Sequence, residues 1–248
     1  MRLYAGVGAA LSEDALTLAL LHDREPTAEL LGELKAVGFP GNLALAPRSE
    51  GGRAAQAAMG AALSVLPDAP DASALDQLAA DFAAIHLTGS LGASPSESFW
   101  LSDDHLVCQD PMFELRRLYA EAGLRAPDWR KRPDDHLVFQ LHYLANRLAA
   151  ARDAGAWRRL AAFLDEHLLR WLPDFAARVT QRDDTALLAA LARLTEAWCE
   201  ELRELLADEL GEPRPSREEL EARLREAGGA EPEAVPLRFL PGAAGPSW

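Results

Sequence analysis

The stretch RPDDHL, residues 132–137, lies between a loop and the strongest helical pattern of the chain. Proline is tolerated in the first turn of a helix, and acidic residues stabilise a helix N-terminus. We therefore predict that a helix begins between Pro133 and Asp135, with His136 in its first or second turn. Apolar residues then recur at the three- and four-residue spacing of one helix face: Leu137, Leu141, Leu144 and Leu148.

The composition indicates the same fold class for the whole chain. Of the 248 residues, 49% are hydrophobic; Ala and Leu dominate, and isoleucine occurs once, at Ile85. Because residues that favour strands are scarce, we predict an all-α fold with a single helical domain of about nine or ten helices. We expect this domain over residues 1–210, with a candidate seam in a loop at 88–104. A C-terminal helix and an extended tail are expected over 211–248.

Helix starts are predicted where a capping residue precedes an apolar pattern. We expect such starts at Ser12, Thr27, Asp71 or Ser73, and Asp110, and at a capping box that joins Ser216 to Glu219. A loop is predicted over residues 41–52. An Ala-rich helix is expected over Ala54–Leu66, and a long amphipathic helix over Thr185–Leu206.

Charge and cysteine content exclude some classes of protein. The formal net charge of −14 argues against a nucleic-acid-binding protein, which normally carries a basic patch. It suits either simple solubility or a partner with positive charge. Two cysteines, Cys108 and Cys199, are too few for a disulfide framework. The N-terminus lacks the apolar core of a signal peptide, and no apolar run is long enough to span a membrane, so we expect a cytoplasmic protein.

A metal-dependent hydrolase is one function that the polar residues allow. Asp134, Asp135 and His136 are residue types that bind metal ions, and His105 follows two aspartates in a similar triplet. His142 does not complete the set, because six residues along a helix turn it to another face. The structural alternative is that an aspartate caps the helix. No nucleophile elbow, phosphate-binding loop or dinucleotide fingerprint is found, and no cofactor is predicted.

A second unusual stretch, PSESFW at residues 95–100, lies in the predicted loop at 88–104. Glycine and proline interrupt the helical pattern there, yet Phe99, Trp100 and Leu101 form a bulky apolar cluster. Loops are normally polar, so such a cluster either packs against the core or binds a partner. We expect at least one of the two aromatic rings to pack against the core.

Together, the two stretches resemble the TorD/DmsD-type (NarJ-like) family of redox-enzyme maturation chaperones. The shared pattern has three parts in the same order and at similar spacing. They are a P-x-E-S-aromatic loop, a helix that begins at Asp110-Pro111 and ends in Y-x-x-x-G at Gly123, and a helix start with P-x-D-H-L. The resemblance extends over residues from about 12 to 210, whose helical pattern also fits.

The resemblance implies an all-α cytoplasmic chaperone that has no catalytic activity and no cofactor. Such a chaperone binds the precursor of a molybdopterin-dependent oxidoreductase, including its twin-arginine signal peptide, and holds it for cofactor insertion before export. It is a monomer or a domain-swapped homodimer, with no nucleic-acid partner and no membrane insertion. Pro133, Asp135 and His136 match the family's peptide-binding motif, and Glu97 and Ser98 match its loop motif.

The chemistry of a signal peptide is compatible with these residues. Carboxylates can pair with the two guanidinium groups, and a groove lined by aromatic side chains can take the apolar part. The predicted peptide-binding residues are Glu97, Ser98, Phe99, Trp100, Pro133, Asp134, Asp135 and His136.

Two positions depart from the family pattern. Arg132 stands where the family usually has an acidic residue before the proline, and Gln140 stands where it has a glutamate. Both change the charge expected on this surface. A helical scaffold without a peptide groove is the remaining alternative.

Overall fold

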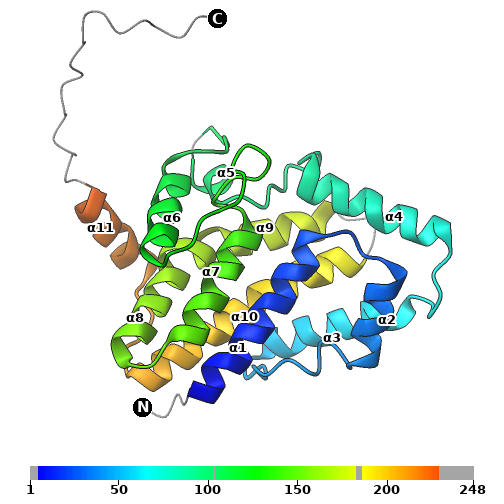
Figure 1. The fold of residues 1–248 in the computed structure, drawn as a ribbon, viewed down its shortest axis with the longest axis horizontal. Helices are drawn as coiled ribbons and strands as arrows, with labels where there is room; N and C mark the ends of the chain where they lie inside the picture. Colours follow the sequence, from blue (N-terminus) through cyan, green and yellow to red (C-terminus); the bar gives the residue numbers. More distant parts are fainter. Residues whose placement is uncertain (1–4, 103, 183–185, 229–248) are drawn as a thin grey trace, which may run out of the picture. The chain divides into compact units, whose positions relative to one another are not determined.

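The computed structural model describes residues 5–102, 104–182 and 186–228. These ranges are all-α and contain no strand, which confirms the predicted fold class. The helix α4 continues into the π-helical turn η1, and α8, η2 and α9 run on without a break. With these segments joined, the described residues form ten continuous helices (Figure 1). No helix in these ranges is long and apolar enough to cross a membrane.

The chain divides into two compact units, one up to Arg214 and one from Pro215. The second unit contributes α11 (Arg217–Gly228) to the described residues. The helices of the first unit are α1 (Ala5–Asp23), α2 (Ala28–Ala36), α3 (Glu50–Val65), α4 (Ala72–Phe82) with η1 (Ala83–Leu87), α5 (Glu97–Leu101), α6 (Asp110–Glu121), α7 (Leu137–Ala150), α8 (Ala154–Phe163) with η2 (Leu164–Leu168) and α9 (Leu169–Arg182), and α10 (Ala186–Leu210).

Several predicted caps are confirmed by side-chain hydrogen bonds. Thr27 accepts from the amide of Leu30 at 3.2 Å, and Asp71 accepts from the amide of Ala74 at 2.8 Å. The capping box of α11 is complete, since the amide of Glu219 donates to Ser216 Oγ at 3.2 Å and the amide of Ser216 donates to Glu219 Oε2 at 2.8 Å. Each cap satisfies a helix N-terminal amide that has no partner within its own helix.

Other predicted boundaries were wrong or fall outside the described residues. Ser12 caps nothing, because α1 already runs from Ala5 through it. The Ala-rich helix α3 begins at Glu50 under a Ser49 cap, so the end of the predicted loop at 41–52 is helical. Thr185 and the tail from residue 229 lie outside the described residues; α10 is described from Ala186 and extends to Leu210.

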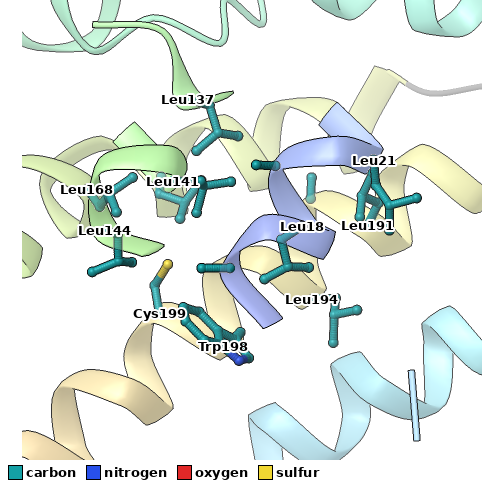
Figure 2. Close-up of a cluster of buried hydrophobic side chains, with 14 of the residues drawn as sticks. Leu18, Leu21, Leu137, Leu141, Leu144, Leu168, Leu191, Leu194, Trp198 and Cys199 are labelled. Atoms are coloured by element: carbon teal, nitrogen blue, oxygen red, sulfur yellow. The ribbon is translucent and has the colours of Figure 1, made fainter. Parts of the chain in front are cut away.

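The core of the first unit forms where α1, α7 and α10 come together (Figure 1). Figure 2 shows Leu18 and Leu21 of α1, Leu137, Leu141 and Leu144 of α7, and Leu191, Leu194 and Trp198 of α10 among these side chains. Burying each such leucine contributes about 2 kcal/mol to folding. Gly8 lets α1 approach α7 closely, since a Cβ there would lie 2.5 Å from the carbonyl oxygen of Leu148. Leu137, the first residue of α7, is one of these core side chains, so the start of α7 is anchored in the core.

Candidate functional site

The two unusual sequence stretches lie side by side and are joined through their backbones. The amide of Leu137 donates to the carbonyl of Pro95 at 2.8 Å, and the amide of Glu97 donates to the carbonyl of Asp135 at 3.1 Å. Ser96 and His136 thus form an isolated antiparallel bridge. We call residues 95–98 and 133–137, together with the side chains of Gln140 and His167, the junction.

The backbone pairing moves the start of α7 from its predicted place. Residues 133–136 are not helical, because they lie extended against residues 95–97. The helix begins at Leu137, and His136 is its N-cap: Nδ1 accepts from the amide of Val138 at 3.2 Å. The prediction of a helix start between Pro133 and Asp135 was therefore wrong. The acidic residues there do not cap this helix; they have other partners.

Asp135 and Ser98 connect the junction to the short helix α5. The amide of Ser98 donates to Asp135 Oδ2 at 2.8 Å, and the amide of Gln109 donates to Ser98 Oγ at 3.2 Å. Both residues have 0% relative exposure. Burial raises the pKa of Asp135 above its ordinary value, while the bonds from Ser98 act in the opposite direction. The segment predicted to be a loop thus contains α5, held at its first turn by a buried carboxylate.

Glu97, Gln140 and His167 form a second buried group in the junction. Gln140 Nε2 donates to Glu97 Oε2 at 3.0 Å and to the carbonyl of Asp135 at 2.9 Å. His167 Nδ1, which comes from η2, lies 3.0 Å from Glu97 Oε1. Burial alone would lower the pKa of His167, but the charge of Glu97 and its hydrogen bond raise it above the ordinary value. An ion pair therefore holds α5 to η2 inside the protein.

Asp134 points away from Asp135 and faces a different neighbour. Its carboxylate accepts from Arg116 Nε at 2.5 Å, and its carbonyl accepts from the Tyr119 hydroxyl at 3.0 Å. Both partners belong to α6. The adjacent aspartates therefore connect the polar stretch to two different helices.

Five of the eight predicted peptide-binding residues are buried: Glu97, Ser98, Asp134, Asp135 and His136. The three carboxylates expected to meet guanidinium groups already have partners within the protein. Phe99, Trp100 and Pro133 are partly exposed. As expected for one of the two rings, Trp100 packs against the core, and its Nε1 donates to the carbonyl of Ser94 at 2.8 Å. The peptide-binding role of these eight residues stays a prediction.

A cleft of about 520 Å³ opens beside the junction. Its lining includes the junction residues Pro95, Ser96, Pro133 and His136, together with Phe99 and His105. Leu87, Leu106 and Val107 also line it, with relative exposures of 63%, 53% and 44%. Lys131 and Arg132 also line the cleft, and Arg132 is paired with Asp23.

The exposed leucine and valine of this lining lie in a constrained loop. His105 and Cys108, which flank Leu106 and Val107, have φ angles of 52° and 61°, in a region that residues other than glycine seldom adopt. His105 Nδ1 lies 2.9 Å from the carbonyl of Phe99 and fixes the first of these turns. Sequence reasoning missed Leu87, Leu106 and Val107. The only sequence signal was their apolar character beside a break in the helical pattern.

The residues proposed for metal binding are not gathered into a metal site. His136 caps α7, Asp134 pairs with Arg116, Asp135 accepts from Ser98, and His105 contacts the backbone of Phe99. Among residues 5–102, 104–182 and 186–228, no group of three or more His, Cys, Asp or Glu side chains is arranged to hold a metal ion.

Comparison with known proteins identifies the family. The sequence profile of the family described as "Nitrate reductase delta subunit" matches residues 49–177. The chaperone protein TorD of Vibrio cholerae serotype O1 is 33% identical over 156 residues, which cover 60% of this chain and 70% of that protein. The TorD of Vibrio parahaemolyticus is 30% identical over 146 residues, or 56% and 67% of the two chains. That of Shewanella loihica is 32% identical over 140 residues, or 54% and 64%.

The chain belongs to the TorD/NarJ chaperone family. The predicted resemblance is thereby confirmed, and so is the prediction that the protein is a chaperone and not an enzyme. Membership implies a role in the maturation of molybdoenzymes. The metal-dependent hydrolase alternative is not favoured.

The two departures from the TorD/NarJ motif have local partners. Arg132 forms an ion pair with Asp23 at the end of α1, and its guanidinium lies 5.7 Å from the ring centre of Phe139. Gln140 uses its amide group as a donor to Glu97 and to the backbone of Asp135, which an ionised glutamate could not do. Arg132 therefore pairs with a neighbouring carboxylate, and Gln140 supplies a hydrogen-bond donor beside the carboxylate of Glu97.

A group of histidines packs between the junction and the core. The ring centres of His22 and His86 are 5.3 Å apart, and those of His86 and His136 are 6.4 Å apart. Burial lowers the pKa of His22 to about 3 and lowers the pKa values of His86 and His136 well below 6.5. His22 also lies 2.9 Å from Thr195 of α10. These three rings are neutral near pH 7 and link α1, η1, α7 and α10.

Proposed function

We propose that this TorD/NarJ-family chaperone binds a molybdopterin-dependent oxidoreductase precursor in the cytoplasm, including its twin-arginine signal peptide. It holds the precursor until the cofactor is inserted and export is allowed. The observation that carries the proposal is the cleft, which lies against the family's motif residues and is bordered by exposed apolar side chains. The protein acts as a monomer or a domain-swapped homodimer.

The apolar part of the signal peptide is the part that suits the cleft. Leu87, Phe99, Leu106 and Val107 offer apolar surface for it, as in other grooves that take apolar segments. A large exposed side chain that becomes buried on binding contributes about 1.5–3 kcal/mol. Leu106 and Val107 keep more than two fifths of their surface exposed in the free protein, so they can gain most from a bound peptide.

The two arginines of the peptide are expected outside the cleft. Lys131, which lines the cleft, would repel them there, and the carboxylates of the junction are already paired. The formal net charge of −14 attracts a cationic peptide from a distance. In this arrangement apolar burial supplies affinity, and the acidic surface favours encounter with a basic segment.

The junction residues then serve peptide binding indirectly. Glu97, Ser98 and Asp135 fix α5 against the start of α7, and Phe99 and Pro133, which line the cleft, belong to the segments that this contact joins. Buried, hydrogen-bonded polar groups of this kind rigidify the elements that they join. On this proposal the family motif shapes the site, and the neighbouring apolar residues touch the client.

Isothermal titration calorimetry with a synthetic twin-arginine signal peptide tests the site. The double variant Leu106→Ser, Val107→Ser should bind about tenfold more weakly than the native protein, since apolar burial is lost. The matched control is Val37→Ser, Val65→Ser, which removes two exposed valines at the ends of α2 and α3. Equal affinities for the two double variants would place the peptide elsewhere.

The maturation role needs a readout in the client. Co-expression of a molybdoenzyme precursor with the native chaperone should raise the molybdenum content of the purified client. The cleft double variant should raise it less than the control double variant does. A client that fills with cofactor equally well without the chaperone would contradict the proposed role.

A further inference from the structure

An exposed arginine–aromatic patch lies on α6 and the loop that follows it. The guanidinium carbon of Arg116 lies 5.4 Å from the ring centre of Phe113 and 5.7 Å from that of Trp129. The guanidinium carbon of Arg130 lies 5.2 Å from the Trp129 ring. Phe113 and Trp129 are 54% and 44% exposed. We call Phe113, Arg116, Trp129 and Arg130 the arginine–aromatic patch.

A buried carboxylate holds the central arginine of the patch in place. Asp134, which is buried, accepts from Arg116 Nε at 2.5 Å, and its own carbonyl accepts from Tyr119. The Arg116 side chain is thereby fixed while its guanidinium contacts both rings. A surface that is ordered before binding loses less conformational entropy when a partner docks. This gives Asp134 a role that the cleft does not require.

The local charge is opposite to that of the whole chain. Residues 116–132 contain six basic and two acidic residues, a net charge of +4, whereas the chain carries −14. Arg117, Arg125, Arg130 and Lys131 have no ion-pair partner in the described part of the chain. A cluster of unpaired positive charge on an acidic protein favours an acidic partner and repels the basic end of a signal peptide.

Apolar exposure is concentrated in the same region. Seven large apolar side chains are exposed among the described residues, and five of them lie between residues 87 and 129. Three of these five belong to the cleft, and the other two are Phe113 and Trp129 of the patch. Tryptophan and arginine are the residues most enriched in the energetic centres of protein interfaces. The patch combines both with a charge that selects one kind of partner.

We propose that the arginine–aromatic patch is a second docking surface, which binds an acidic protein segment carrying apolar or aromatic side chains. Carboxylates of that segment pair with Arg130 and its unpaired basic neighbours, and its apolar side chains pack on Phe113 and Trp129. This surface is distinct from the cleft, so the chaperone holds an acidic segment and a signal peptide at the same time.

The probe is a short synthetic peptide in which Glu and Asp alternate with Leu and Phe. A second peptide has Gln and Asn in place of Glu and Asp. Calorimetry should detect binding of the acidic peptide and at least tenfold weaker binding of the amide peptide. Affinity for the acidic peptide should fall as salt is raised, because exposed charges are screened. Equal binding of the two peptides would overturn the proposal.

Variants separate the patch from the cleft. Arg130→Glu and Trp129→Ala should each lower the affinity for the acidic peptide about tenfold. Arg24→Glu makes the same charge change at an exposed site on another segment and should leave the affinity unchanged. The double variant Leu106→Ser, Val107→Ser should bind the acidic peptide normally, so failure of the cleft and failure of the patch give different results. If Arg130→Glu and Arg24→Glu weaken binding equally, only net charge matters and the patch is excluded.

Asp134→Asn tests the support beneath the patch. Asp134→Asn should weaken binding of the acidic peptide more than Arg117→Gln does, although only Arg117→Gln removes a positive charge. An anionic membrane surface is the alternative ligand of the patch, and vesicles of phosphatidylglycerol test for it. Binding to these vesicles that depends on Trp129, without binding to the acidic peptide, would overturn the proposal.

Discussion

At the junction, polar side chains are buried and paired, whereas at the cleft a few residues away apolar side chains are exposed. Glu97, Ser98 and Asp135 have 0% relative exposure, but Leu106 and Val107 keep 53% and 44%. Both regions reverse the usual distribution, in which polar residues face water and large apolar residues fill the core. The junction is therefore a buried support, whereas the cleft leaves apolar surface exposed to solvent, which suits the proposed binding of another molecule.

The difference shows why a sequence motif can be informative without being the contact surface. Charged groups are seldom buried unless they are paired, so a buried set joined by hydrogen bonds strongly constrains the residues that can form it. Apolar contacts at the cleft tolerate exchange among residues of similar size. The rigid part is thus easier to recognise in sequence than the part that we expect to touch a client.

The largest expected effect is that of Gln140→Glu. It places a carboxylate where Gln140 Nε2 now lies 3.0 Å from Glu97 Oε2, so a buried hydrogen bond becomes a repulsion. We expect the free energy of unfolding at pH 7 to fall by about 4 kcal/mol. Part of this loss should return as the pH is lowered, because two adjacent carboxyl groups bind a shared proton.

Urea denaturation at pH 7 and pH 5 measures both effects. Gln77→Glu is a matched control, since Gln77 Nε2 donates to Asp81 Oδ1 at 3.1 Å but its side chain is exposed on α4. The control should cost about 0.5 kcal/mol. A Gln140→Glu protein as stable as the control would show that the junction is more hydrated than its burial indicates.

Asp135→Ala is expected to have the next largest effect. It removes the acceptor of the Ser98 amide and leaves that amide buried without a partner, so about 2 kcal/mol of stability should be lost. The neighbouring Asp134→Ala should cost about 1 kcal/mol, because its partner Arg116 is exposed and can be solvated. Thermal unfolding of the two variants, followed by circular dichroism, compares them. If Asp134→Ala lost more stability than Asp135→Ala, the contact of Asp134 with α6 would stabilise the protein more than the contact of Asp135 with α5.

Acid should weaken the contact between the junction and the core. The pKa of His22 is lowered to about 3, and those of His86 and His136 are lowered well below 6.5. Below pH 6.5 the unfolded chain binds protons at these histidines while the folded protein does not, so stability falls as the pH falls toward 3. His167 has the opposite sign: its raised pKa contributes stability below pH 6.5, and this is lost as the pH rises through that raised value.

The variant His86→Phe isolates one of these histidines. It should reduce the loss of stability between pH 6.5 and pH 5 by about 1.5 kcal/mol. Chemical denaturation at the two pH values provides the measurement, and the exposed His142→Phe is the control. An unchanged pH dependence in His86→Phe would show that the histidine group does not govern acid stability.

The smallest expected effect is that of the cleft double variant on folding. Leu106→Ser, Val107→Ser should change the free energy of unfolding by less than about 0.5 kcal/mol, as for most exposed positions. Its effect on peptide affinity is the one that matters. A large loss of stability would instead assign these two residues to the support and not to the open surface.

The all-α fold could be predicted from the sequence because it depends on local patterns. Leucines at helical spacing identified α7 and α10. The caps predicted at Thr27 and Ser216 are confirmed, and of the alternatives Asp71 and Ser73 the structure shows Asp71. The start of α7 was missed for a non-local reason. Pro133 and the two aspartates favour a helix N-terminus, but the backbone of residues 95–97 pairs with theirs and keeps them extended.

The candidate site was predicted only in part. The sequence indicated that residues 95–100 and 133–137 belong together, and the structure joins them. It did not indicate which side chains face inward, since charged residues are assumed to be exposed unless a partner is known. The partners of Asp134, Glu97 and Arg132 come from α6, η2 and α1, at positions that no local pattern identifies.

The sequence separations within the junction have a consequence for how the protein folds. Ser98 contacts Asp135 across 37 residues, and Glu97 contacts His167 across 70. Closing loops of this length costs conformational entropy before the contact can repay it, so we expect helices such as α7 and α8 to form before these bonds. Pro95, Ser96, Pro133 and His136, which line the cleft, belong to the segments that the Ser98–Asp135 bond joins. We therefore expect a nascent or partly folded chain to lack the cleft and, on the proposed function, to bind no client.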